Sequence, residues 1–134
     1  MLRAYLIYLY ASLRARFHNP MSDCVFCKIV SKEIPAKVLY ADEQVTAFLD
    51  INPLAPTHIL IIPNKHISSV NDLKPEDESL MGHIIMVARQ VAIEQGIAEN
   101  GYRLITNTGV HAGQTIFHMH FHLLGGHRMK YPMG

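Results

Sequence analysis

One stretch late in the sequence, His118 to Leu124, constrains the fold more than any other. It alternates three histidines with apolar residues, His118, His120 and His122 with Met119, Phe121 and Leu123. Side chains of a β-strand point to opposite faces with a period of two, so the histidines would share one face and the apolar residues the other. On a helix the same histidines would fan out over about 200°. The pattern therefore predicts a strand with one face in a core and a row of histidines on the other.

Size and composition are those of one folded domain. The chain has 134 residues, of which 49% are hydrophobic, and a net charge of +1, which argues against a disordered chain and against a general nucleic-acid binder. The apolar run Ala4–Leu13 is about half of the roughly 20 residues that a bilayer-spanning helix needs. We therefore expect no nucleic-acid partner and no stable membrane insertion.

Residues 1–20 differ from the rest, being apolar with scattered arginines. Two interpretations stay open: translation begins at Met21 and these residues are an upstream extension, or they form an anchor helix at a membrane surface. In both cases the sequence predicts an N-terminal extension over 1–20 and a folded domain over 21–134.

Periodicity and turn residues predict the order of the elements. A short helix would begin after an N-cap at Ser22 or Asp23, and a long helix would begin at Pro75, which suits the first helical position. The segment His58–Pro63 is apolar on both faces and would lie centrally in the sheet. The expected strands cover 38–40, 45–49, 58–63, 101–107 and the histidine run, and the expected helices cover 23–30 and 75–95. The predicted class is α+β, with a five-stranded antiparallel sheet and one long and one short helix.

Two cysteines, Cys24 and Cys27, are spaced as C-x-x-C. Two cysteines cannot build a disulfide framework, so the pair indicates metal or redox chemistry in a reducing compartment, and we expect a cytoplasmic protein. A redox role is the weaker alternative, because the pair opens a helix without a thioredoxin-like βαβ pattern.

With these residues in view, the histidine run resembles the signature of the histidine triad (HIT) family of nucleotide hydrolases and transferases. The likeness to its HINT branch, the purine nucleoside phosphoramidases, continues through the segments 26–34, 48–51, 55–58, 62–66 and 113–126. It covers about everything from Met21 to Gly134. The resemblance implies a HIT-like fold and a nucleotide-hydrolysing enzyme.

The resemblance also implies roles for the histidines. His120, the middle one, would attack the α-phosphorus of a nucleoside monophosphate ester or amide and form a nucleotidyl-histidine. Neutral imidazole has an ordinary pKa near 6.5, so a free lone pair exists at neutral pH. The other histidines of the implied active site are His122, a phosphate contact or proton donor, His58 on a neighbouring strand, and His118.

The implied nucleotide site would take AMP or GMP derivatives. The turn Gly113, Gln114 and Thr115 would hold phosphate, with successive backbone N–H groups as an anion-binding nest. Asn107 would contact phosphate or ribose, and the carboxylate of Asp50 would accept from both ribose hydroxyls. The residues that would form the apolar base pocket are Phe26, Ile29, Ile34, Phe48 and Ile51, with a purely structural place in the core as the alternative for Ile29.

The same resemblance implies a structural zinc site of Cys24, Cys27, His66 and His118, since bacterial relatives carry zinc on such a set. Two thiolates and two imidazoles make a closed tetrahedral site. The alternative is a pair of reduced thiols, with His66 capping a turn.

A homodimer is expected, with the sheet continuing across it and the tail Tyr131–Gly134 reaching the partner's site. The long helix has a wide apolar band that one sheet face covers only in part, and the strand over 102–107 would otherwise be an open edge. The residues of this band are Leu80, Met81, Ile84, Ile85, Val87, Ala88 and Val91.

Two functions compete with phosphoramidate hydrolysis. One is hydrolysis of dinucleoside polyphosphates, as in the Fhit-like branch, which the Gly125-Gly126 pair and the short tail disfavour. The other is a nucleotide-sensing module whose catalysis is incidental. Turnover of an adenosine phosphoramidate separates these alternatives.

Overall fold

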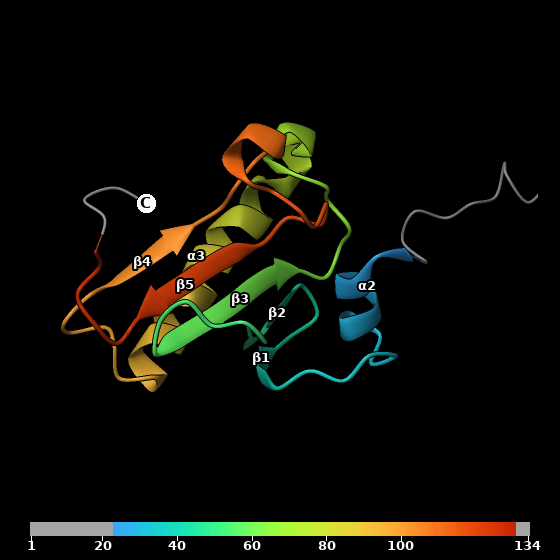
Figure 1. Cartoon of the computed structure of the whole chain (residues 1–134). Helices are drawn as coiled ribbons and strands as arrows, with labels where there is room; N and C mark the ends of the chain where they lie inside the picture. Colours follow the sequence, from blue (N-terminus) through green and yellow to red (C-terminus); the bar gives the residue numbers. More distant parts are fainter. Residues whose placement is uncertain (1–22, 131–134) are drawn as a thin grey trace, which may run out of the picture.

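The computed structural model describes residues 23–130. Within them, five strands pair antiparallel in one sheet of order β1-β2-β3-β5-β4, which confirms the predicted fold class (Figure 1). The strands are β1 (Val38–Ala41), β2 (Val45–Leu49), β3 (Thr57–Pro63), β4 (Tyr102–Ile105) and β5 (Phe121–Gly125). The long helix α3 (Glu78–Glu94) lies along one face of the sheet, and the short helix α2 (Val25–Val30) lies beyond β1 and β2 (Figure 1).

The alternation of side chains along the strands builds a core on each face. In β3, Ile59 and Ile61 belong to the larger core beneath α3, whereas Leu60 and Ile62 pack with Phe26 of α2 on the other face. All four of these β3 side chains are buried. The prediction of a central strand that is apolar on both faces is therefore confirmed, and β3 stands in the middle of the sheet.

Both helices begin later than predicted. The N-cap of α2 is Cys24, whose Sγ accepts the backbone N–H of Cys27 at 3.3 Å, and not Ser22 or Asp23. At the long helix, Pro75–Asp77 forms a separate 3₁₀ turn, and α3 starts at Glu78. The cause is Asp77, whose buried carboxylate accepts from Lys65 Nζ at 2.7 Å and from the backbone of Lys74 at 3.0 Å.

The histidine strand is shorter than predicted, because β5 begins at Phe121 and leaves His118–His120 outside the ladder. The pairing with β3 ends at Ile61 and Phe121, and the N–H of Met119 bonds instead to the carbonyl of Ile67 at 2.6 Å. The side chains nevertheless keep the period of two. Met119, Phe121 and Leu123 all pack in the core beneath α3.

The glycine pair after the histidines closes this end of the sheet. A Cβ on Gly125 would meet Ile97 Cδ1 at 2.7 Å, and one on Gly126, whose φ is +95°, would meet Pro56 Cβ at 2.8 Å. Both positions therefore require glycine. Only at Gly126 does the backbone conformation add to the steric demand.

Some predictions concern residues outside the described range: the extension 1–20, the start at Met21 and the tail Tyr131–Gly134. Among residues 23–130, no helix combines the length and the apolar character that crossing a bilayer requires.

Candidate active site and metal-binding cluster

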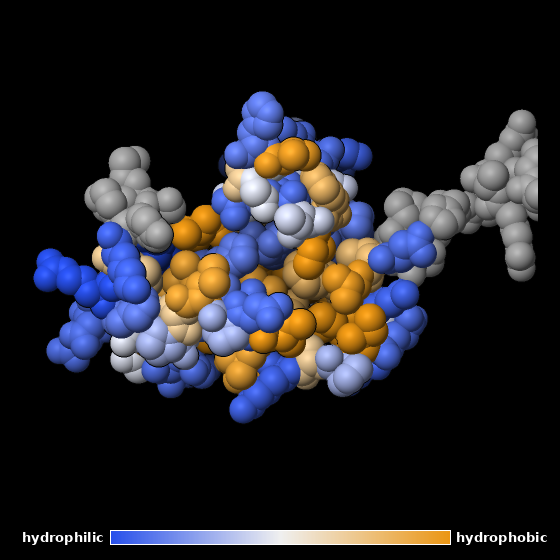
Figure 2. Space-filling view, in the orientation of Figure 1, coloured by the Kyte–Doolittle hydropathy of each residue, from blue (hydrophilic) through white to orange (hydrophobic). Residues whose placement is uncertain are grey.

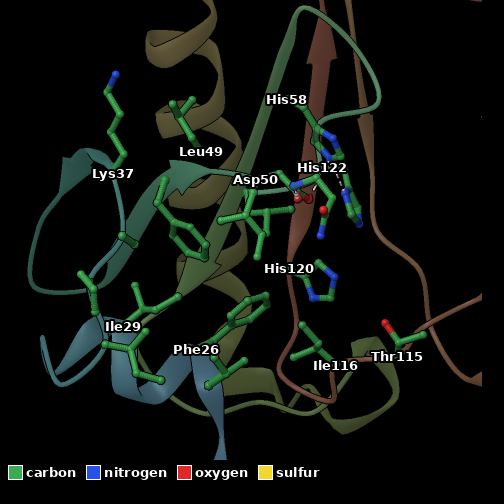
Figure 3. Close-up of a pocket in the computed structure, with 18 of the residues that line it drawn as sticks. Phe26, Ile29, Lys37, Leu49, Asp50, His58, Thr115, Ile116, His120 and His122 are labelled. Carbon is green, nitrogen blue, oxygen red and sulfur yellow. Dashed lines mark hydrogen bonds and ion pairs between the residues drawn. The ribbon is translucent and has the colours of Figure 1, made fainter.

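A pocket of about 770 Å³ opens on the sheet face opposite α3, between α2, the end of β2 and the histidines (Figure 3). Apolar side chains gather around a hollow on this face of the molecule (Figure 2). The structure brings most of the predicted site residues into its lining: Phe26, Ile34, Phe48, Asp50, Ile51, His58, Thr115, His120 and His122. A cavity with a long apolar wall and a few convergent polar groups at one end is typical of a small-ligand site.

The apolar wall comes from α2 and β2. Phe26 and Phe48 are buried with their rings edge to face at a centroid distance of 5.5 Å, and Phe26 also meets the ring of His120 edge-on at 5.2 Å. Ile51 is 91% exposed and so stands at the mouth of the pocket. The wall is therefore suited to a flat ring lying between α2 and β2, with polar groups reaching toward the histidines.

Several lining residues were missed from the sequence, among them Val25, Lys37, Leu49, Leu60 and Ile116. Leu60 could have been found from strand periodicity, because it lies two residues after His58 on β3. Leu49 could not, because it directly follows Phe48 on β2 and the same period places it on the other face. Lys37 had no such signal, since it precedes β1 and reaches the pocket only through the fold.

His120 is held in one protonation form by its own backbone. Its Nδ1 lies 2.7 Å from the carbonyl oxygen of His118. A carbonyl only accepts, so Nδ1 carries the proton and Nε2 of the neutral ring carries the lone pair. The carbonyl of His120 accepts in turn from the hydroxyl of Thr106 at 2.8 Å, a contact that ties the residue to the end of β4 and was not predicted. The ring is thus set up as a nucleophile through Nε2.

A chain of bonds fixes the proton of His122. The backbone N–H of Leu54 donates to Nδ1 of His58 at 3.0 Å, so the proton of the neutral His58 ring is on Nε2. This Nε2 lies 2.8 Å from Nδ1 of His122, which must accept. His122, on β5, therefore carries its proton on Nε2. Its ring stands 5.0 Å from that of His120, beside the nucleophile.

The environment keeps the rings of His122 and His58 neutral. Burial, together with the neighbouring His120 and His58, lowers the pKa of His122 to about 4. Burial also lowers the pKa of His58, against the opposing effect of Asp50, whose Oδ2 lies 3.3 Å from Nε2 of His58. At neutral pH His122 is therefore a neutral donor, and the chain from Leu54 determines which nitrogen donates.

Asp50, His58 and His122 also place three donor atoms within 4.8 Å of one another, as a metal site would. Metal binding through Nε2 of His58 would move the ring proton to Nδ1, where it would face the N–H of Leu54. Two donors would then oppose each other, so we interpret this group as a proton chain.

The predicted phosphate turn lies only partly in the pocket. The N–H of Gly113 bonds to the carbonyl of Val110 at 3.0 Å and that of Gln114 to Gly109 at 3.1 Å, so these two donors are engaged within the loop. Of the turn, Thr115 lines the pocket, whereas Gly113 and Gln114 do not, and Asn107 lies half-buried outside the lining.

Gln114 instead organises the loop from within. Its buried amide donates to the carbonyls of Ser68 at 2.7 Å and Ile116 at 3.1 Å, and its Oε1 accepts the N–H of Gly109 at 2.9 Å. The side chain thus fixes the loop and places Thr115 beside the histidines.

The predicted metal ligands converge next to the pocket. The structure brings Cys24, Cys27, His66 and His118 together, with their donor atoms all within 4.8 Å. Nδ1 of His118 lies 3.3 Å from Cys24 Sγ and 3.5 Å from Cys27 Sγ, and Nδ1 of His66 lies 3.3 Å from Cys27 Sγ. A tetrahedral zinc site would separate sulfur from nitrogen by about 3.6 Å. These residues could therefore hold a metal ion.

The surroundings suit such a cation. Nε2 of His118 donates to the carbonyl of Pro63 at 2.7 Å, which leaves the lone pair of Nδ1 directed at the sulfurs. Burial lowers the pKa of His118 to about 4, so this ring is neutral as a ligand must be. Without a cation, burial and the neighbouring Cys24 raise the pKa of the Cys27 thiol to about 11.

The comparisons with known proteins agree with this geometry. The family model described as "HIT domain" matches residues 31–129. The chain belongs to the HIT family. It is 55% identical over 104 residues to the purine nucleoside phosphoramidase of Escherichia coli K12, an alignment that covers 78% of this chain and 87% of that protein. It is 44% identical to an uncharacterized HIT-like protein of Synechocystis, over 84% of this chain and 97% of that one.

Solved structures give the same assignment. A HIT family hydrolase from Legionella pneumophila superposes with a TM-score of 0.81 at 47% identity, covering 84% of this chain and all of that one. A histidine triad protein from Clostridium difficile superposes with a TM-score of 0.79 at 41% identity, over 81% and 95% of the two chains. The HIT fold expected from the histidine motif is thus confirmed.

Proposed function

We propose that this protein is a hydrolase of nucleoside 5′-monophosphate amides and esters, with purine nucleoside phosphoramidates, derivatives of AMP or GMP, as its substrate class. The observation that carries the proposal is the bond from His120 Nδ1 to the carbonyl of His118, which presents Nε2 as a nucleophile in a pocket fit for a nucleoside. The substrate class is supported by the likeness to the phosphoramidase of E. coli.

The reaction would take place in two steps. Nε2 of His120 attacks the α-phosphorus, the bond to the leaving amine breaks, and the amine takes up a proton from solvent. Nε2–H of His122, directed by the bond from His58, donates a hydrogen bond to a phosphoryl oxygen or to the departing nitrogen. Water then attacks the phosphorus and loses a proton to solvent, the bond to His120 breaks, and the nucleoside monophosphate is released. The base would lie against the wall that Phe26 and Phe48 form, and the ribose hydroxyls would face Asp50.

We propose that zinc occupies the Cys24–Cys27–His66–His118 cluster. The support is the donor set, the sulfur–nitrogen distances and the bond that orients His118. Bound there, zinc would supply a rigid crosslink among α2, the segment after β3 and His118, two residues before the nucleophile. Metal analysis of protein purified without chelator should find about one zinc per chain, and Cys24→Ser should lower that content. Absence of zinc with both thiols freely titratable would remove this part of the proposal.

We further propose a homodimer in the cytoplasm. Both cysteines are free thiols, as suits a reducing compartment. In the described part of the chain, β4 is a terminal strand that pairs only with β5, which leaves its other edge available to a second copy.

The decisive test is to trap the intermediate. The protein is mixed with an adenosine phosphoramidate and quenched in alkaline denaturant, and the adduct is mapped by mass spectrometry. We expect an adenylyl group on His120. His120→Ala should lower kcat by about 10⁴-fold or more while AMP binding persists, because the attacking nitrogen is lost. An adduct on another residue, or near-normal kcat in the variant, would overturn the proposal.

A further inference from the structure

The two cysteines flank the turn of chain that forms one wall of the nucleotide pocket. Cys24 is the N-cap of α2 and Cys27 lies one helical turn later. Between them, Val25 and Phe26 line the pocket, and Phe26 meets the ring of His120. A change in the covalent state of the cysteine pair therefore acts on the turn that carries these two contacts.

A second connection runs through His118. Its ring nitrogen Nδ1 faces both sulfurs, at 3.3 Å from Cys24 and 3.5 Å from Cys27. Its carbonyl oxygen accepts the Nδ1–H of His120 at 2.7 Å. One residue thus contacts the thiols with its side chain and fixes the nucleophile with its backbone.

The cysteine pair is close enough in space for a disulfide to form. The two sulfurs lie within 4.8 Å of each other, and both residues are partly exposed. Residues three apart at the start of a helix have Cα atoms about 5 Å apart, inside the range that disulfides span. The N-cap backbone of Cys24 is extended, at φ −79° and ψ 114°, so its side chain points back over the turn and accepts the N–H of Cys27.

We infer that Cys24 and Cys27 are an oxidation site, at which a hydroperoxide converts the two thiols into a disulfide and thereby weakens the placement of His120. One thiolate attacks the peroxide oxygen, the O–O bond breaks, and a sulfenic acid and one molecule of water or alcohol form. The second thiolate then attacks the sulfenic sulfur, the S–S bond forms, and water leaves. The two sulfurs lose two electrons and the peroxide gains them.

This inference deepens the proposed function, because the sulfurs belong to the proposed zinc cluster. A disulfide leaves only His66 and His118 as donors, too few for a closed tetrahedral site, so the metal is released. His118 then keeps its bond to the carbonyl of Pro63 at 2.7 Å but loses its partners at Nδ1. We expect kcat/KM for the phosphoramidate to fall about ten-fold and AMP to bind more weakly, since α2 and His120 are affected together.

The test uses the full chain loaded with zinc and treated with a small excess of hydrogen peroxide. Four quantities are measured: intact mass, zinc released to a chromogenic chelator, AMP affinity and turnover. We expect a loss of two hydrogen atoms in mass, zinc release and a fall in turnover, all reversed by dithiothreitol with added zinc. The reversal excludes methionine oxidation, because dithiothreitol does not efficiently reduce methionine sulfoxide. Cys27→Ser, which cannot form the bridge, is the control for the mass change alone, because it also lacks one of the proposed zinc ligands.

Two results would overturn the inference: thiols that resist the oxidant under these conditions, or a disulfide that forms while zinc, AMP affinity and turnover stay unchanged. If the reduced protein shows no turnover at all, the proposed function fails. The oxidation site is then judged from mass, zinc release and AMP affinity, which do not depend on catalysis.

Discussion

His58 donates its Nε2 proton to Nδ1 of His122 across 2.8 Å. The direction of this bond is set by Leu54, whose backbone N–H fills Nδ1 of His58 at 3.0 Å. A main-chain amide in the loop before β3 therefore decides which nitrogen of a β5 histidine donates in the pocket. Hydrogen-bonded units of this kind act as a whole, so their members should contribute non-additively.

The first prediction tests this coupling. His122→Ala should lower kcat about 10²- to 10³-fold, less than His120→Ala, because it removes a donor and not the nucleophile. His58→Ala should lower kcat by part of that factor, and the double variant should be no slower than His122→Ala alone. The measurement is a double-mutant cycle in kcat, with His83→Ala, on the α3 side of the sheet, as the control. Strictly multiplicative effects would mean that His58 acts independently of His122.

The second prediction concerns Asp50. Its Oδ1 accepts the N–H of Asn52 at 2.8 Å, which holds the carboxylate at the rim of the pocket. Asp50→Asn should weaken AMP binding about ten-fold or more, the effect of losing a charged hydrogen-bond acceptor. A 2′,3′-dideoxy analogue should lose much less affinity, because it has no hydroxyl to donate. Equal losses for the two ligands, measured by calorimetry, would exclude a ribose contact.

The third prediction is a fall in stability in mild acid. The pKa of His122 is lowered to about 4 by burial and by the nearby His120 and His58, with Asp50 opposing. The unfolded chain, with an ordinary pKa near 6.5, binds more protons than the fold between these values. Stability is thus complete above about pH 6.5 and falls as the pH drops toward 4.

Thermal melts at several pH values check this expectation. His122→Gln should flatten the decline between pH 6.5 and 4, because glutamine does not titrate. The decline that remains should come from the other buried rings, including His58, whose pKa is also lowered. Asp42 contributes only at lower pH: burial opposes its ionisation, but bonds from Tyr40, His83 and two backbone amides hold its pKa below the ordinary value. A variant with the same pH profile as the parent would contradict the assignment.

The sequence predicts those parts of this molecule that depend on local periodicity. The alternation in His58–Pro63 and in the histidine run determines which side chains meet α3, and the structure confirms both patterns. The shortening of β5 could not be predicted, because it depends on the N–H of Met119 pairing with Ile67, a partner from another segment. The motif predicts on which face of the sheet each side chain lies, but not how many of its residues pair with β3.

In the candidate site, too, the sequence predicts the residues of the motif but not their partners from other segments. His122 and His58 meet because β5 and β3 are neighbouring strands, and His120 lies just before β5. Two backbone groups, the amide of Leu54 and the carbonyl of His118, determine which nitrogens of these rings carry the protons. Every residue has such groups, so residue identity does not predict these contacts. The contact of His83 Nε2 with Asp42 at 2.6 Å, across 41 positions of sequence, is likewise not predictable from the two residue types.

The last prediction concerns the dimer, for which α3 is informative. Five residues of the predicted apolar band, Leu80, Ile84, Val87, Ala88 and Val91, pack on the chain's own sheet and so cannot form an interface. A different face remains uncovered: Ile85, Met86 and Ile93 are 45%, 57% and 52% exposed. At 100° per residue these three and Gly82 lie within about a quarter turn of the helix. A Cβ at Gly82 would have no neighbour within 4 Å. Because Gly82 itself has no side chain, a second helix could approach this face closely.

We expect this face to pack against its counterpart across a two-fold axis, since each copy can bury the same apolar residues of the other. Light scattering at micromolar concentration should give about twice the monomer mass of 15.1 kDa. Ile85→Glu should shift the species toward the monomer, because a charge would be buried against an apolar surface. Val38→Glu, at an equally exposed apolar residue on β1 (46% against 45% for Ile85), is the matched control outside α3 and should leave the mass unchanged. A monomeric parent protein would exclude the dimer. An Ile85→Glu variant that stays dimeric would place the interface elsewhere, with the open edge of β4 as the next surface to substitute.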